Sequence, residues 1–207
     1  MGSKLIAIGI GYLFGCFLTA ETVARKFAGK PAAEVGDTGN PGMANMMDAL
    51  GFLPGILTLA GDLGKCIAAA LISYCLFKEE GRIILFYAGL GCTLGHDFPF
   101  WRGFRGGKGV ATSSMAMALY SFPIGLGANI AGLLVVIATK YLSIAGPVIP
   151  LVFTIAMLVR ADREAAVISG ILTILALYSH MSSNLGIRSG NTEKTDLMKG
   201  ISNKLKR

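Results

Sequence analysis

The chain has few of the side chains from which metal centres, disulfide frameworks and hydrolytic sites are commonly built. Its 207 residues include two histidines, one tryptophan and four cysteines. No Cys-x-x-Cys pair or cysteine–histidine cluster occurs, and every cysteine lies within an apolar segment: Cys16, Cys66, Cys75 and Cys92. We therefore expect small buried thiols, with no metal and no disulfide.

The motifs of several enzyme classes are also missing. The chain contains neither the G-x-S-x-G motif of serine hydrolases nor the H-E-x-x-H motif of zinc proteases. The nucleotide P-loop, G-x-x-x-x-G-K-[ST], is absent as well, because Lys108 is followed by Gly109. The sequence thus identifies no nucleophile–base pair and excludes a P-loop site.

Charge is scarce, and long apolar segments take its place. Only 15% of the residues are charged and 53% are apolar, whereas a soluble domain carries about 25% charge. The mean hydropathy is +0.62 and the isoelectric point about 9.4. The net charge of +7 comes from cations that stand between apolar runs, which indicates a multi-pass membrane protein and no binding of nucleic acid.

Seven apolar segments predict an all-α membrane protein with seven transmembrane helices, some of them short or half-depth. Two of the segments, 83–95 and 109–121, are shorter than the ~20 residues that cross a bilayer straight. Pro147 and Pro150 are expected to bend another. We expect a single domain over residues 1–207, with a polar, basic tail at 180–207. The segments are 5–24, 52–77, 83–95, 109–121, 122–139, 141–159 and 165–179.

The basic residues predict how the chain crosses the membrane. Loops 25–51 and 96–108, Lys140 and the tail together hold thirteen Lys and Arg, whereas the opposite ends of the spans hold five. Positively charged loops stay in the cytoplasm. The N-terminus is therefore predicted to lie outside and the C-terminus in the cytoplasm.

One polar stretch, residues 95–114, combines glycines and cations between apolar segments. Glycines allow backbone N–H groups to converge, and cations at the start of a helix make an anion site, most naturally for phosphate. The alternative is a basic loop that only orients two membrane helices. The residues concerned are Gly103, Gly106, Gly107, Gly109, Arg102, Arg105, Lys108 and His96.

Two further observations concern polar residues near or within the membrane. Asp62 and Lys65 are three residues apart, on one helical face, and could either line a site or form an ion pair that locks helices together. The remaining unusual polar residues, in loop 38–45, loop 96–108 and at Ser143 and His180, all fall on the predicted cytoplasmic side. The residues alone therefore indicate a phosphate-handling membrane site.

The sequence resembles the bacterial membrane-integral glycerol-3-phosphate acyltransferases that use acyl phosphate as donor. The strongest likeness is Gly95-His-Asp-Phe-Pro-Phe-Trp-Arg-Gly-Phe-Arg-Gly-Gly-Lys-Gly-Val-Ala-Thr112, which is similar to that family's second motif. The run from Gly39 to Asn45 is similar to the first motif. Asp62 with Lys65, and Tyr141-Leu-Ser-Ile-Ala145, also match family positions.

The resemblance implies transfer of an acyl group from acyl phosphate to the 1-hydroxyl of sn-glycerol 3-phosphate, giving lysophosphatidate and phosphate. It implies a bacterial inner membrane, no cofactor and no obligate protein partner. His180, Asn184 and Ser143 match catalytic positions. The positions that match the substrate-binding site are Thr38, Gly39, Asn40, Gly42, Asn45, Arg105, Gly106, Gly107, Lys108 and Gly109.

The sequence departs from the family pattern at three places. Asn184 stands four residues after His180 and Arg188 four after that, where the family has three and three. Ala44 replaces a threonine. Asp48 stands where the family has an arginine that grips phosphate.

These departures leave alternatives open. Asp48 could pair with a neighbouring cation: Arg25, Lys26, Arg105 or Arg188. Otherwise the acceptor is another alcohol, or activity is impaired. The alternative function is a transporter or lipid-binding paralogue on the same fold.

Overall fold

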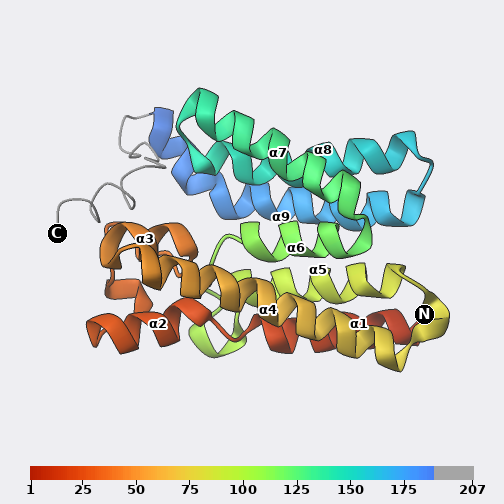
Figure 1. Cartoon of the computed structure of the whole chain (residues 1–207), viewed down its shortest axis with the longest axis horizontal. Coiled ribbons are helices and arrows are strands. Elements are labelled where there is room, and N and C mark those ends of the chain that lie inside the picture. The colour runs from red at the N-terminus through yellow and green to blue at the C-terminus, as the bar shows by residue number, and fades with distance from the viewer. Residues whose placement is uncertain (189–207) are drawn as a thin grey trace.

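The computed structural model describes residues 1–188, and within that range the regular elements are all helical (Figure 1). Three single-turn 3-10 helices, η1 (Ala32–Glu34), η2 (Lys78–Glu80) and η3 (Phe100–Arg102), lie in the connections. The α-helices are α1 (Gly2–Gly15), α2 (Thr19–Ala28), α3 (Met43–Leu50), α4 (Phe52–Leu76), α5 (Ile83–Asp97), α6 (Val110–Tyr120), α7 (Phe122–Thr139), α8 (Leu142–Val159) and α9 (Arg163–Arg188).

Six segments of the described chain are long and apolar enough to cross a membrane, and α6 is a shorter apolar helix. This confirms the prediction of an all-α membrane protein with seven transmembrane helices. Figure 1 shows the seven lying along one axis, with the start of α1 and the end of α9 at opposite ends of the bundle. The six long segments are Gly2–Ala28, Phe52–Leu76, Ile83–Arg102, Phe122–Thr139, Leu142–Val159 and Arg163–Ile187.

Several predicted boundaries are wrong. The first span is broken, because α1 ends at Gly15 and α2 begins at Thr19. The polar loop 25–51 contains the helix α3. The last span does not end at residue 179, since α9 continues to Arg188 and takes in the first part of the predicted tail. The rest of that tail lies outside the described residues.

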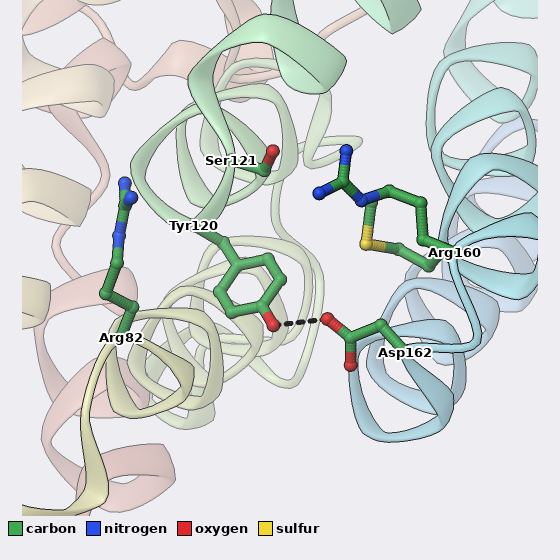
Figure 2. A pocket seen from close by; sticks show the side chains of 6 residues that line it. Arg82, Tyr120, Ser121, Arg160 and Asp162 are labelled. Carbon is green, nitrogen blue, oxygen red and sulfur yellow. Dashed lines mark hydrogen bonds between the residues drawn. The ribbon is translucent and has the colours of Figure 1, made fainter.

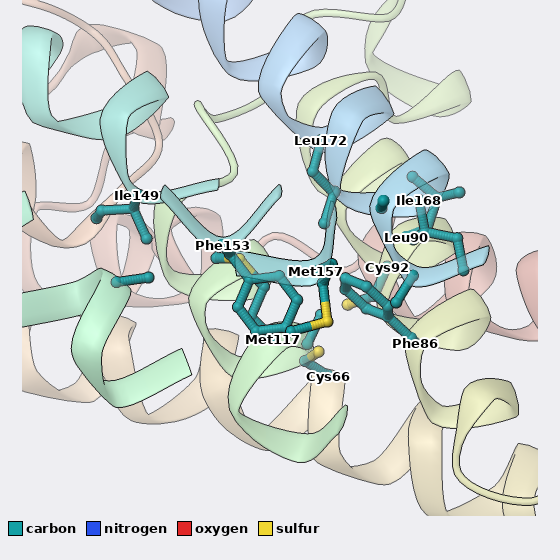
Figure 3. Packing of buried hydrophobic residues seen from close by; sticks show 14 residues of the cluster. Cys66, Phe86, Leu90, Cys92, Met117, Ile149, Phe153, Met157, Ile168 and Leu172 are labelled. Carbon is teal, nitrogen blue, oxygen red and sulfur yellow. The ribbon is translucent and has the colours of Figure 1, made fainter. Parts of the chain in front are cut away.

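The core of the bundle is packed around aromatic and sulfur-containing side chains from four helices (Figure 3). Phe86 of α5 lies edge-on to Phe153 of α8, with ring centroids 5.6 Å apart, and both are fully buried. Met117 of α6 and Met157 of α8 belong to the same cluster. Burial of each such side chain stabilises the packed bundle by dispersion contacts, while the outer faces keep their apolar residues for lipid.

Glycines bring α1 and α5 into backbone contact. A Cβ atom added at Gly11 would lie 2.0 Å from the carbonyl oxygen of Ala88, and one at Gly95 would lie 2.1 Å from that of Tyr12. Gly15 and Gly91 are equally crowded. Each helix therefore presents a Gly-x-x-x-Gly stripe to the other, the arrangement that lets membrane helices approach most closely. This contact packs the second half of α5, which leads into the glycine-rich segment, directly against α1.

The break between α1 and α2 is held by side chains from distant parts of the chain. Lys65 donates to the carbonyl oxygens of Phe17 (2.8 Å) and Gly15 (3.3 Å). Trp101 donates its indole N–H to the carbonyl of Cys16 at 2.8 Å. Main-chain carbonyls that have no hydrogen-bond donor within their helix need another donor inside a membrane. These side-chain donors therefore stabilise the break between the two helices.

Asp62 and Lys65 form the ion pair that anchors this break. Their charged atoms are 2.9 Å apart, and the residues are only 2% and 7% exposed. Thr19 donates to the carboxylate at 3.1 Å, and the Lys65 ammonium lies 2.8 Å from Nδ1 of His96. Of the two alternatives for this pair, the structure supports the one that locks helices together.

Candidate functional site

The glycine-rich segment doubles back on the end of α5. The N–H of Gly106 donates to the carbonyl of Asp97, and that of Gly107 donates to the carbonyl of His96, both at 2.9 Å. A Cβ atom at Gly107 would lie 2.1 Å from Nε2 of His96. These two N–H groups are already paired within the chain, so a phosphate-binding role for them is not supported. Glycine is required here for close approach.

The segment ends at the start of α6. Gly109 has φ +65°, and a side chain there would meet the carboxylate of Asp97 at 2.9 Å. The first N–H groups of α6 have no partner inside the helix and point out of its N-terminal end, where the helix dipole is positive. Lys108 stands directly before this end. The geometry suits an anion that is held by a lysine and a helix N-terminus together.

Lys108 is half-buried and points towards α9. Its ammonium group donates to the hydroxyl of Ser183 at 2.6 Å. Burial lowers the pKa of Lys108 below its ordinary value of 10.5, because desolvation disfavours the charged form. An anionic ligand beside the ammonium would offset that effect. Ser183 was missed in the sequence, since a serine near a helix end carries no signal by itself.

His180 lies one turn before Ser183, buried between α9 and α8. Its Nδ1 donates to the carbonyl of Ala176 at 2.9 Å, which leaves Nε2 of the neutral ring as a hydrogen-bond acceptor. The ring packs against Gly146, where a Cβ atom would lie 2.6 Å from Nε2. The glycine on α8 therefore makes room for the imidazole.

Two polar atoms near His180 are buried without a partner among residues 1–188. They are Oγ of Ser143, near the start of α8, and Oδ1 of Asn184, one turn after His180. Buried polar atoms are nearly always hydrogen-bonded in folded proteins. These unpaired groups lie on the facing helices α8 and α9, so a polar ligand placed between the two helices would complete their hydrogen bonding.

Asp97 is a further candidate that the sequence reading did not single out. The residue is 3% exposed; its Oδ2 accepts a hydrogen bond from Ser179 at 2.9 Å, and its Oδ1 has no partner in the described chain. It connects the end of α5 with the start of α6 and with α9, next to His180. A carboxylate within an apolar run is the signal that could have identified it.

The first predicted motif forms a compact turn before α3. Thr38 donates to Oδ1 of Asn45 at 3.0 Å and accepts the N–H of Asn40 at 3.3 Å. Asn45 in turn donates to the carbonyl of Val35 at 2.7 Å. Gly39 has φ +57° and leaves no room for a side chain beside Ala33. In this structure the polar groups of Thr38 and Asn45 stabilise the turn itself.

This turn, with α3, lies at the end of the bundle where α9 ends (Figure 1). Gly42 precedes the first turn of α3, whose N–H groups are a second helix terminus at this end. Asp48 lies on the exposed face of α3. Of its proposed partners, Arg25 pairs with Glu21 at 2.8 Å, and the side chain of Arg188 lies outside the described residues. Arg105 is exposed.

Fold and site together define a class: an integral, multi-pass helical membrane protein with a group of buried and half-buried polar residues at one end of its bundle. The family model named glycerol-3-phosphate acyltransferase matches residues 5–190. The chain belongs to the glycerol-3-phosphate acyltransferase family.

Relatives over the full length agree with this assignment. Glycerol-3-phosphate acyltransferase 1 of Lactobacillus johnsonii is 36% identical over 202 residues, which cover 98% of this chain and 97% of that protein. The protein of the same name from Lactobacillus acidophilus is also 36% identical, with the same coverage of both chains. The glycerol-3-phosphate acyltransferase of Shouchella clausii is 33% identical over 196 residues, covering 92% of this chain and 95% of that protein.

The fold matches a solved structure. It is the crystal structure of PlsY (YgiH), an integral membrane glycerol 3-phosphate acyltransferase, in its glycerol 3-phosphate form. The TM-score is 0.83 at 24% identity, with 96% of this chain and 98% of that chain covered.

Proposed function

We propose that this protein transfers an acyl group from acyl phosphate to the 1-hydroxyl of sn-glycerol 3-phosphate, as an integral membrane enzyme. Family membership supports the acyl transfer to glycerol 3-phosphate. One structural observation supports the site most directly. Lys108, the free N-terminus of α6 and the unpaired polar atoms of Ser143 and Asn184 come from segments that meet around His180.

The chemistry requires little more than positioning. Acyl phosphate is an activated mixed anhydride, so no strong protein nucleophile is needed. The glycerol hydroxyl oxygen attacks the acyl carbonyl carbon, the bond between that carbon and the phosphate oxygen breaks, and the hydroxyl proton leaves with the phosphate. Holding the two reactants together and stabilising the oxyanion that develops on the carbonyl supply most of the rate enhancement.

The site residues divide these tasks. Lys108 and the N-terminus of α6 hold a phosphate group, since an ammonium and a positive helix end attract the same charge. Nε2 of His180 accepts the proton of the attacking hydroxyl and passes it to the departing phosphate, and Ser143 and Asn184 orient the bound substrate. The acyl chain lies along the apolar faces of the neighbouring helices. This assignment uses no metal ion or other cofactor.

The predicted placement in the cell forms part of the proposal. Residues 1–207 form one domain in the bacterial inner membrane, with the Thr38 turn, the Lys108 segment and the C-terminal tail in the cytoplasm. The excess of Lys and Arg at that end supports this orientation. A cysteine introduced near the C-terminus should stay unlabelled by an impermeant thiol reagent in intact cells. Labelling of this cysteine would show that the C-terminus lies outside the cell.

The reaction is tested by measuring phosphate release from palmitoyl phosphate by the purified protein, with and without glycerol 3-phosphate. We expect release that depends on the acceptor and is accompanied by lysophosphatidate. The matched control is Ser143→Ala, which removes one unpaired hydroxyl and should slow the transfer while the protein stays folded. Intact protein that releases no phosphate in either condition would favour the alternative, a lipid-binding or transport protein on this fold.

A further inference from the structure

The end of the bundle opposite the proposed site contains a polar pocket. It has a volume of about 230 Å³ and is lined by Arg82, Tyr120, Ser121, Met157, Arg160 and Asp162. These residues come from the start of α5, the junction of α6 and α7, and the turn between α8 and α9. No part of the proposed acyl transfer uses this pocket.

Both arginines of the pocket are without a carboxylate partner. Within residues 1–188 neither Arg82 nor Arg160 forms an ion pair. Arg82 donates one N–H to the carbonyl of Leu119 at 3.2 Å, which leaves its other N–H groups available. Figure 2 shows the two arginines on opposite sides of Tyr120. Two unpaired guanidinium groups on one pocket are suited to an anion.

The one carboxylate in the lining is already engaged. Asp162 accepts the N–H of Ala165 at 3.1 Å through Oδ1, and the hydroxyl of Tyr120 donates to its Oδ2 (Figure 2). The Tyr120 ring is held in place by stacking on Phe86, with centroids 5.1 Å apart. Asp162 therefore caps α9 and orients Tyr120. The two arginines of the lining carry more positive charge than this one carboxylate balances.

The surroundings indicate what kind of anion fits. The pocket lies where two membrane-spanning helices end, since α7 begins at Phe122 and α8 ends at Val159. Phe122, Leu158 and Val159 are 62%, 62% and 82% exposed. The polar pocket is thus bordered by apolar side chains that face lipid. A ligand that carries a phosphate next to acyl chains satisfies both surfaces, whereas free phosphate uses only one.

We propose that this pocket binds the phosphate group of a phospholipid in the leaflet opposite the acyltransfer site. Arg160 and Arg82 contact the phosphate oxygens, Ser121 donates its hydroxyl, and the acyl chains lie over Phe122 and Val159. The volume is below the roughly 300–1,000 Å³ of pockets that enclose whole drug-sized ligands. That size fits a headgroup with its chains left in the bilayer. This binding does not depend on the acyltransferase activity.

The test measures lipid binding by native mass spectrometry of the purified protein in detergent, titrated with dioctanoylphosphatidylglycerol. All variants also carry Lys108→Ala, which weakens lipid binding at the other phosphate site. We expect Arg82→Gln with Arg160→Gln to weaken binding by at least about tenfold, the effect of losing a charge-assisted contact. The matched control Arg163→Gln removes a nearby exposed arginine that does not line the pocket and should leave the affinity unchanged.

Each other outcome overturns the proposal. Equal affinity of the double variant and its parent for the phospholipid would show that the pocket does not bind the lipid. A loss in Arg163→Gln as large as in the double variant would indicate a general surface-charge effect. Dioctanoylglycerol binding as tightly as the phospholipid would exclude phosphate recognition, and inorganic phosphate that competes at equal concentration would assign the pocket to the free ion. Gel filtration and thermal unfolding check that each variant remains folded. The variant Arg82→Lys with Arg160→Lys, which keeps both charges, is compared in the same way.

Discussion

The buried pair of Asp62 and Lys65 predicts an unequal response to the loss of either partner. Lys65 contacts the Asp62 carboxylate, the His96 ring and two main-chain carbonyls. Asp62 has fewer partners, chiefly Lys65 and the hydroxyl of Thr19. Replacing Lys65 leaves a buried carboxylate with little compensation, whereas replacing Asp62 leaves an ammonium that still has three acceptors.

The magnitudes follow from this difference. Lys65→Met should lower the free energy of unfolding by about 3–5 kcal/mol, the usual effect of breaking a buried ion pair on one side. Asp62→Asn should lower it by about 1–3 kcal/mol, since the remaining lysine keeps its hydrogen bonds. The double variant should lose less than the sum of the two, because no charge is left unpaired.

The assay can use a natural probe. Trp101 is the single tryptophan of the chain, and its N–H binds the carbonyl of Cys16 in the same break. Unfolding in mixed micelles with increasing dodecyl sulfate can be followed by its fluorescence and, globally, by circular dichroism. If Asp62→Asn is the more damaging change, the argument from the number of remaining partners is refuted. If both variants lose less than about 1 kcal/mol, as for surface pairs, the locking role is refuted.

Three further predictions concern the site. Lys108→Ala should lower kcat/KM about ten- to a hundredfold through the loss of one charge-assisted contact, with poor rescue by arginine. Burial lowers the Lys108 pKa below 10.5, so the kcat/KM of the wild-type protein should fall as the pH rises through that lowered pKa. This decrease should be missing in the alanine variant. Wild-type-like activity of the alanine variant would contradict the assignment. Gly107→Ala should abolish activity by pushing His96 away, whereas Gly103→Ala, in open space although at φ +60°, should be milder; equal effects would show that crowding at His96 is unimportant. Asp48→Arg should lower the KM for glycerol 3-phosphate, measured by initial rates, while loss of activity together with turnover of another alcohol by the unmodified protein would show that the acceptor is different.

The membrane-spanning helices could be predicted because each one is visible as a continuous segment of the sequence. Runs of apolar residues bounded by charges identified α4, α7 and α8 to within a residue or two. The break between α1 and α2 was not predictable from any local window. Its carbonyls are satisfied by Lys65, 48 residues away from Phe17, and by Trp101, 85 residues away from Cys16. A polar residue inside an apolar run shows that a partner exists but does not show which one.

The glycine-rich segment could be located from the sequence, but the contacts that its residues make could not. Glycines, a lysine and a histidine in one segment led to the prediction of an anion site with converging N–H groups, whereas the N–H groups of Gly106 and Gly107 are paired within the chain. The sequence could not distinguish glycines that open N–H groups to a ligand from glycines that admit a neighbouring side chain. Gly106 and Gly107 belong to the second kind. Asp97 was missed for a related reason, since its partner Ser179 is 82 residues further along the chain.

The glycine contact between α1 and α5 has a consequence for how the protein is made. When α1 leaves the ribosome, the helix that fits its glycine stripe has not been synthesised. The break that follows α1 must also wait for a donor, because unpaired carbonyls are costly in lipid. The first donor to arrive is Lys65, on a helix that brings its own counter-ion three residues earlier.

The helix α4 can therefore insert without a lone charge entering the bilayer. α4 settles the break first, and α5 then closes on α1 and delivers His96 and Trp101 to the same place. A nascent chain halted before α5 is complete would present an uncovered glycine stripe of α1 to the lipid.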